Sequence, residues 1–165
     1  MIEVKIPAGV TFAVEGNRAK ATGPKGTVER EFKGTQVSLA LDGGVLRARA
    51  KSLAIENTVR AHLANMAKGV SEGFVKKMRI KFAHFPATME VKGRDILIKN
   101  FLGEKKARKT KIAGATKIEV KGAEITVSGP DKEDVGQTAA NIRTATKIRG
   151  HDCRVFQDGI YIVDE

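Results

Sequence analysis

The chain of 165 residues contains an internal duplication, and this feature constrains its fold more than any other. Residues 7–26 (PAGVTFAVEGNRAKATGPKG) align with residues 84–103 (HFPATMEVKGRDILIKNFLG), and AHLANMAKG aligns with QTAANIRTA further along the chain. Apolar residues and turn glycines keep the same order in the two copies, as these pairs show: Val14 and Val91, Gly16 and Gly93, Ala19 and Ile96, Ala21 and Ile98, Gly26 and Gly103, Met66 and Ile142. Two copies of one unit predict two similar domains in tandem.

Each copy has the same plan, which is a set of short strands followed by one helix. Alternating apolar residues predict strands at IEVKI, VTFAV, VSLAL and VLRAR in the first copy, and at TMEV, DILIK, KIEV and EITV in the second. Apolar residues at steps of three and four predict the two helices. Their apolar stripes are Ile55, Val59, Leu63, Met66 and Val70 in the first copy, and Val135, Ala139, Ile142 and Ile148 in the second.

The predicted fold class is therefore α+β, with two tandem duplicated domains, each an antiparallel β-sheet packed against one α-helix. A further strand, predicted where Val75, Met78, Ile80 and Phe82 are apolar, connects the copies. We expect residues 1–77 to form the first repeat and residues 78–165 to form the second.

The charge of the chain points to a polyanionic partner. Lys and Arg number 30 against 19 Asp and Glu, which gives a net charge of +11 and a pI of about 9.9. Repulsion on this scale disfavours a compact chain unless a polyanion neutralises it, and nucleic acid is the commonest such partner. A membrane surface is the other candidate, but the sequence has neither an amphipathic basic helix nor a lipid-anchor motif.

Cysteine content and hydropathy bear on the compartment. Cys153 is the only cysteine, so no disulfide can form within the chain, and a reducing compartment is expected. The segment MIEVKIPAGV does not have the pattern of a secretory signal, and no apolar run approaches the length of a membrane span. We therefore expect a soluble, cytoplasmic protein.

Positive charge is concentrated in the segment GEKKARKTK at residues 103–111, which holds five cations and one acid. A polyphosphate backbone rewards several cations at once, because each neutralised phosphate releases condensed counterions. The alternative is a solvated run of charge on an ordinary surface. The candidate ligands of phosphate are Lys105, Lys106, Arg108, Lys109 and Lys111.

The first copy has no such charge at the corresponding place. Its counterpart, GTVEREFKG at residues 26–34, balances Arg30 and Lys33 with Glu29 and Glu31. Residues 1–75 carry 11 bases and 7 acids, net +4, whereas residues 76–165 carry 19 and 12, net +7. A requirement of the fold would act on both copies, so the basic segment is interpreted as a surface for a partner. We expect charge reversal there to weaken RNA binding far more than reversal at Arg30 and Lys33.

A second group of cations follows in the predicted helix and the C-terminal segment. Arg143 and Lys147 are spaced by one helical turn, and Arg149 and Arg154 come after them. On the face opposite Val135 and Ile142 they are placed to bind phosphates. A helix that covers its exposed face with cations is also common, so the pattern alone leaves both interpretations open.

Catalytic, metal and cofactor sites are not indicated. His151 and Cys153 lack a second His or Cys pair at metal-ligand spacing. GPKG lacks the other residues of a phosphate-binding loop, and no nucleophile–base arrangement or paired carboxylates stand out. We therefore expect no enzymatic activity, no cofactor and no small-molecule substrate.

The scarcity of aromatic residues limits how RNA would be recognised. The chain has no Trp, one Tyr and seven Phe, and Phe156 and Tyr161 lie near the end rather than on a central strand. Base stacking on an open sheet, as in RNA-recognition motifs, is therefore not expected. Contacts to the phosphates and 2′-hydroxyls of a folded RNA fit the composition better.

Four segments resemble the family of the sixth universal protein of the large ribosomal subunit, in its archaeal and eukaryotic branch: AHFP, NFLGEKKARK, SGPDKEDVGQTAANIR and RVFQDGIYI. The resemblance covers essentially the whole chain. It implies a duplicated α+β protein bound to large-subunit rRNA near its 3′ end, close to the sarcin–ricin loop and the translation-factor site, with neighbouring ribosomal proteins as further partners. Bacterial members carry a Lys/Gly-rich signature near the C-terminus, where this chain has DCRVFQDGIYI instead.

The resemblance also implies that the second domain makes most of the rRNA contacts. It supports Lys105, Lys106, Arg108, Lys109, Arg143 and Arg154 as contacts, whereas Lys111, Lys147 and Arg149 rest on charge and spacing alone. Two alternatives stay open: a free-standing RNA-binding or RNA-chaperone module, and an enzyme that modifies nucleotides with unusual residues.

Overall fold

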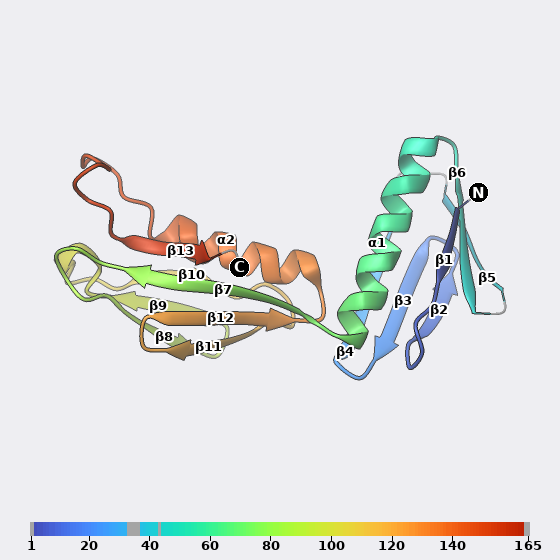
Figure 1. The fold of residues 1–165 in the computed structure, drawn as a ribbon, viewed down its shortest axis with the longest axis horizontal. Coiled ribbons are helices and arrows are strands. Elements are labelled where there is room, and N and C mark those ends of the chain that lie inside the picture. Colours follow the sequence, from blue (N-terminus) through green and yellow to red (C-terminus); the bar gives the residue numbers. More distant parts are fainter. Residues whose placement is uncertain (1, 33–36, 43, 164–165) are drawn as a thin grey trace. The chain divides into compact units, whose positions relative to one another are not determined.

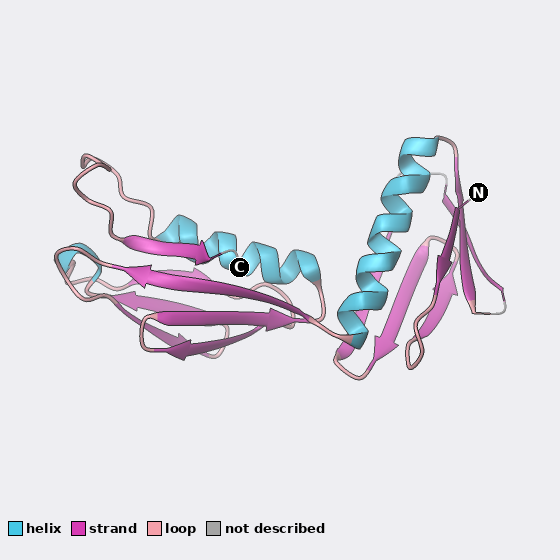
Figure 2. Ribbon diagram, in the orientation of Figure 1, coloured by secondary structure: helices cyan, strands magenta, loops and turns pink. Residues whose placement is uncertain are grey.

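The computed structural model describes residues 2–32, 37–42 and 44–163. The chain divides into two compact units, one of Met1–Phe74 with Pro130–Lys132 and one of Val75–Gly129 with Glu133–Glu165. Each unit has one long helix beside antiparallel strands (Figures 1 and 2). The predicted α+β class with two duplicated domains is confirmed.

The strands of the first unit form two small sheets. One has the order β2-β3-β4 and the other has the order β1-β6-β5, with antiparallel pairing throughout. The bounds are β1 Ile2–Lys5, β2 Thr11–Glu15, β3 Arg18–Gly23, β4 Gly26–Glu31, β5 Val37–Asp42, β6 Val45–Ala50 and α1 Leu53–Ser71.

Helix α1 supplies the apolar face that closes the first unit. Ser52 caps its N-terminus, because the Ser52 hydroxyl accepts a hydrogen bond from the N–H of Ala54. The predicted stripe is confirmed: Val59, Leu63, Met66 and Val70 are buried and Ile55 is half-buried. The stripe packs against inward residues of β3 and β6 such as Ala19 and Leu46, which are fully buried.

The second unit repeats this arrangement and adds a strand. Its sheets have the orders β10-β9-β8 and β11-β12-β7-β13. The bounds are β7 Phe74–Lys81, β8 Thr88–Lys92, β9 Asp95–Lys99, η1 Phe101–Gly103, β10 Arg108–Lys111, β11 Lys117–Lys121, β12 Glu124–Gly129, α2 Lys132–Ala145 and β13 Gly159–Val163. By strand order β7 takes the place of β1, and β13 has no counterpart in the part of the first unit that the structure describes.

The strands β3, β4, β10 and β13 were not predicted. In β3 the inward residues are only Ala19 and Ala21, and in β10 they are Arg108 and Thr110, so apolar alternation is weak or missing there. The strand predicted between the copies is confirmed as β7. The predicted boundary between residues 77 and 78 falls inside this strand.

Helix α2 buries Val135, Ala139 and Ile142 as predicted, but Ile148 lies beyond its end at Ala145. The assignment of Ile148 to the helix stripe was wrong. The reason is Thr146, which is buried and accepts a hydrogen bond from the N–H of Ile160 at 3.2 Å. This bond ties the chain to β13 and directs it away from the helix axis.

The two units differ most in one hairpin connection. Residues 24–25 join β3 to β4, whereas residues 100–107 join β9 to β10. In register, Ala21 faces Val28 and Ile98 faces Arg108, so Arg108 occupies the place of the buried Val28. The predicted match of Gly26 with Gly103 is therefore wrong, because the longer connection shifts the alignment between the two glycines.

In the part of the chain that the structure describes, neither helix combines the length and the hydropathy that a membrane span requires.

Candidate nucleic-acid interface

The basic segment at residues 103–111 is loop in its first half and strand in its second half. Lys105 and Lys106 lie in a bend and are exposed. Arg108–Lys111 form β10, in which Lys109 and Lys111 are exposed and Arg108 and Thr110 are half-buried. The alternation follows from the register, since Arg108 and Thr110 face the buried Ile98 and Ile96 of β9.

The register shows where the two repeats differ in charge. Lys109 and Lys111 of β10 occupy the places of Glu29 and Glu31 of β4. Two acids in one copy thus correspond to two lysines in the other at the same face of the same strand. The predicted comparison with Lys33 lies outside the described residues.

The connection between β9 and β10 has an unusual backbone. Asn100 and Leu102 have φ angles of 55° and 52°, and Gly103 has 74°. For leucine this left-handed conformation is unfavourable by about 1–2 kcal/mol, so contacts elsewhere must hold it. Two such contacts are the burial of Phe101 and a hydrogen bond from Asn100 Nδ2 to the carbonyl of Pro86, 3.0 Å long.

Arg108 joins three elements. Its Nε and Nη2 donate to the Glu104 carboxylate at 2.9 and 2.6 Å, and its Nη1 donates to the carbonyls of Ala145 and Lys147 at 2.9 and 3.3 Å. The guanidinium also lies over the ring of Phe101, with Cζ 4.5 Å from the ring centroid. We call Glu104 and Arg108, together with the carbonyls of Ala145 in α2 and Lys147 just after it, the Arg108 clamp.

The clamp perturbs the titration of both side chains. The hydrogen bonds from Arg108 hold the pKa of the Glu104 carboxyl below its ordinary value, and the same bonds raise the pKa of Arg108. Both groups therefore stay charged at neutral pH. The guanidinium also satisfies carbonyls that an α-helix leaves without partners at its C-terminal end.

The clamp brings the two predicted groups of cations together. An open hollow of about 390 Å³ is lined by Arg108 and Lys109 from β10, by Thr144 and Ala145 from α2, and by Lys147 and Arg149 from the segment after it. These residues come from two segments that are well separated in sequence. Lys109, Lys147 and Arg149 together give a concave cationic surface that suits a phosphate backbone.

Arg143, near the end of α2, does not line this hollow. It lines a second hollow, of about 580 Å³, together with Lys147, Phe156 and residues of β13. Lys147 is thus common to both hollows. We call Lys105, Lys106, Lys109, Arg143, Lys147 and Arg149 the cationic rim.

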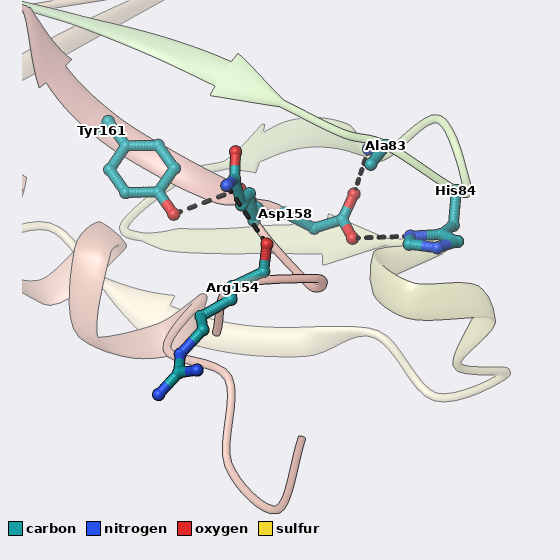
Figure 3. A network of polar contacts seen from close by, with 6 residues as sticks. Ala83, His84, Arg154, Asp158 and Tyr161 are labelled. Carbon is teal, nitrogen blue, oxygen red and sulfur yellow. Dashed lines mark hydrogen bonds and ion pairs between the residues drawn. The ribbon is translucent and has the colours of Figure 1, made fainter. Parts of the chain in front are cut away.

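The chain after α2 is ordered by a polar network (Figure 3). The buried Asp158 carboxylate accepts hydrogen bonds from the backbone N–H of Ala83 and from His84 Nδ1, the latter at 3.3 Å. Burial acts to raise the pKa of Asp158, but these hydrogen bonds outweigh it and hold the pKa below its ordinary value. The ring of Phe156 contacts the rings of His84 and His151, at centroid distances of 4.9 and 4.7 Å.

Four predicted cations line neither of these two hollows: Lys105, Lys106, Lys111 and Arg154. The Arg154 backbone belongs to the turn before β13, accepting from Gln157 Nε2 at 3.3 Å, while its guanidinium points away from the network (Figure 3). The Lys111 carbonyl accepts from Asn141 Nδ2 at 3.1 Å, and its side chain is exposed on β10. Both Arg154 and Lys111 remain accessible, at the margins of the surface.

The predicted cations other than Arg108 have no acidic partner among the described residues. Across residues 2–32, 37–42 and 44–163, no ion pair is formed by Lys105, Lys106, Lys109, Lys111, Arg143, Lys147, Arg149 or Arg154. By contrast, Arg79 pairs with Glu124 at 2.8 Å and Lys99 with Glu90 at 2.6 Å. Cations without a partner are free to exchange their counterions for phosphates.

Sequence reasoning missed Glu104, Phe101 and the carbonyls at the end of α2. The spacing of Glu104 and Arg108 by four residues was a usable signal, although it normally indicates a pair on a helix. The role of the α2 carbonyls depends on packing and had no signal in the sequence. Within the described residues, no group of three or more His, Cys, Asp or Glu side chains could hold a metal ion.

The duplicated α+β units and the concave cationic surface define a class of basic proteins suited to a folded polyanion. A family model described as Ribosomal protein L6 matches residues 6–73 and again residues 85–159, once for each repeat. The chain belongs to the ribosomal protein L6 family.

Curated relatives match over nearly the whole chain. The chain is 48% identical to large ribosomal subunit protein uL6 of Methanosarcina mazei, with 98% of this chain and 95% of the relative covered. Identity is 44% to the uL6 protein of Methanocella arvoryzae, covering 99% and 96%, and 43% to that of Aeropyrum pernix, covering 98% and 92%. The resemblance described from sequence motifs is confirmed.

Proposed function

We propose that this chain is a structural constituent of the large ribosomal subunit and that its second repeat binds folded large-subunit rRNA. Membership of the ribosomal protein L6 family supports the assignment to the large subunit. The cationic rim supports the second repeat as the surface that binds rRNA. The observation that carries the proposal is the meeting of Lys109, Lys147 and Arg149 around one hollow. The protein would act in the cytoplasm as part of the ribosome, without catalysis.

The mechanism is a prearranged set of charges. The sheets and α2 hold the cationic rim in a defined array, so few side chains need to be ordered when rRNA binds. Each phosphate that the rim neutralises releases condensed counterions. With about five such contacts, the logarithm of the binding constant falls with the logarithm of salt concentration at a slope of roughly −3 to −5.

The two repeats are proposed to differ in role. Residues 78–165 would form the rRNA-binding domain, with Arg154 and Lys111 as outer contacts. Residues 1–77 would touch rRNA or neighbouring ribosomal proteins more lightly. The wider location that we propose is near the 3′ end of the large-subunit rRNA, close to the sarcin–ricin loop and the translation-factor site.

The test of the assembly is sedimentation of the native protein from its source cells through a gradient at moderately high salt. We expect near-stoichiometric migration with the large subunit. Recovery at the top of the gradient would contradict this and favour the free-standing RNA-binding or chaperone module. A photoreactive group placed at Lys106 then tests the location, because its cross-links should map close to the 3′ end of the rRNA.

A further inference from the structure

We propose that Arg108 is a positioning residue, which arranges the neighbouring lysines for phosphate contact and does not itself bind phosphate. The inference rests on the proposed function, since it concerns the same surface. It changes the expectation from sequence, in which Arg108 was one cation among five. It also assigns a role to Glu104, the one acid of the basic segment.

The first repeat shows what happens at this place without the clamp. There the short β3–β4 turn lies directly against the end of α1, and the N–H of Lys25 donates to the carbonyl of Val70 at 3.0 Å. The approach is so close that a Cβ on Gly23 would lie 2.6 Å from that carbonyl oxygen. A backbone N–H thus satisfies the helix end.

In the second repeat the longer connection puts a side chain in this place. The carbonyls of Ala145 and Lys147 at the end of α2 accept from Arg108 Nη1 instead. Arg108 occupies the register position of the buried Val28, and its side chain is 25% exposed, with the guanidinium over the ring of Phe101. In both copies, the residues at this place therefore connect a hairpin to the end of a helix: β3–β4 to α1 in the first copy and β9–β10 to α2 in the second.

Four of the five N–H donors of Arg108 are engaged within the described structure. A guanidinium has five N–H donors, and four of its hydrogen bonds go to Glu104 and the two carbonyls. To bind a phosphate with two N–H groups, as guanidinium groups commonly do, Arg108 would have to give up at least part of its bonding to the Glu104 carboxylate or to the carbonyls of Ala145 and Lys147. Lys105, Lys106 and Lys109 have no such commitments within the described part of the chain.

The clamp surrounds the lysines in sequence. Glu104 and Arg108 bracket Lys105 and Lys106, and Lys109 directly follows Arg108. Closing the clamp therefore joins the two ends of the bend to each other and ties Arg108 to the end of α2, where Lys109 lines the same hollow as Lys147 and Arg149. Ordering this segment in the free protein removes an entropy cost that binding would otherwise meet.

This arrangement leads to an outcome that charge alone does not predict. Removal of the acid Glu104 should weaken rRNA binding, although it makes the surface more positive. A simple electrostatic surface predicts the opposite, because an acid near phosphates is repulsive. The matched control is Glu119, which is exposed on β11 and forms no ion pair with any described residue.

The experiment measures binding of the full chain to large-subunit rRNA isolated from the source cells, as a function of salt. The variants are Glu104→Gln, Glu119→Gln, Arg108→Lys and Lys109→Gln. Thermal unfolding checks that each one folds. The Nε–H resonance of Arg108, observed by ¹⁵N NMR without RNA, reports the clamp directly.

We expect Glu104→Gln and Arg108→Lys to weaken binding about five- to tenfold with the salt slope unchanged, because the segment must then be ordered on binding. Glu104→Gln should also shift the Arg108 Nε–H resonance or broaden it, and Arg108→Lys, which removes that resonance, identifies it in the spectrum. Lys109→Gln should weaken binding and reduce the salt slope by roughly 0.7–0.9, the loss of one phosphate contact. Glu119→Gln should bind as the unchanged protein does, or slightly more tightly.

Glu104→Gln binding as tightly as Glu119→Gln would overturn the inference, as would full affinity in Arg108→Lys. A reduced salt slope in Arg108→Lys would indicate that Arg108 itself contacts phosphate, with the same consequence. Failure of the unchanged chain to bind would overturn the proposed function and this inference with it. If Lys109→Gln weakened binding while Glu104→Gln bound fully, the positioning role of Arg108 would be overturned and the proposed function would stand.

Discussion

At the scale of single residues, the second unit depends on buried polar groups that hold irregular segments in place. Asp158 fixes the start of β13 to the chain after β7, through Ala83 and His84. Thr146 fixes the end of α2 to β13 through Ile160. Both residues lie next to cations of the proposed surface, so their effect on RNA binding is through the order of these segments.

The first prediction concerns Asp158→Asn. The folded protein holds the pKa of this carboxyl below the unfolded value, so its contribution to stability is full above the unfolded pKa and is lost as pH falls through the folded pKa. We expect the substitution to lower the unfolding free energy at neutral pH by about 1–3 kcal/mol. It should also flatten the acid side of the stability profile, measured by denaturant unfolding from pH 7 to 3. An unchanged slope below pH 5 would contradict this role.

What the sequence could predict at this scale was the identity of the cations, not their arrangement. Lys105, Lys106 and Lys109 stand out by density of charge alone. That Arg108 turns inward could not be seen, because β10 lacks apolar alternation and the helix end reaches it only in the folded unit. The side of α2 that carries Arg143 followed from the burial of Val135 and Ile142.

At the scale of elements, the two hairpins β3–β4 and β9–β10 are the same structure with different connections. Large apolar residues made β9 predictable from Ile96 and Ile98, whereas β3 was missed because Ala19 and Ala21 stand in their places. The small residues of β3 allow α1 and the β3–β4 turn to approach closely. The same packing that made β3 hard to predict thus explains why its turn is short.

The second prediction tests this packing with two alanine substitutions of opposite sign. Gly23→Ala should destabilise the protein by about 1–3 kcal/mol, because the new Cβ would lie 2.6 Å from the Val70 carbonyl oxygen and 3.0 Å from its Cβ. Gly136→Ala in α2 should stabilise it by about 0.5–1 kcal/mol, since a Cβ there meets nothing within 4 Å in the described structure and alanine favours a helix. Denaturant unfolding of both variants measures the difference, and equal effects would show that the close approach at Gly23 is not limiting.

At the scale of the whole molecule, the duplication provides an internal control for charge. Both repeats share a scaffold, yet the excess of positive charge is larger in the second, and Lys109 and Lys111 stand where the first has Glu29 and Glu31. The fold class and the repeat were predictable because they depend on apolar periodicity. The hollow that joins the two groups of cations was not, because it depends on where a helix ends.

The third prediction compares charge reversal in the two repeats. Lys105, Lys106 and Lys109 changed together to Glu should lower affinity for large-subunit rRNA by more than a hundredfold at low salt, and should reduce the salt slope by roughly 2–3. The matched control changes Lys25, Lys51 and Arg60, which are exposed in the first repeat and form no ion pair with other described residues. This control variant changes the net charge by the same amount as the first, and we expect its affinity for rRNA to fall less than tenfold. Comparable losses in the two triple variants would argue against a division of roles between the repeats.

The different lengths of the β3–β4 and β9–β10 connections also predict where relatives of this chain can differ in length. In the first repeat, a residue inserted between β3 and β4 would have to displace the end of α1, because Gly23 already lies against Val70. In the second, the connection of residues 100–107 is anchored at its end by Arg108, and its length is not dictated by backbone contact with α2. Natural selection should therefore remove insertions from one hairpin and tolerate them in its twin. Among relatives of this chain, changes of length should gather between β9 and β10 and be rare between β3 and β4.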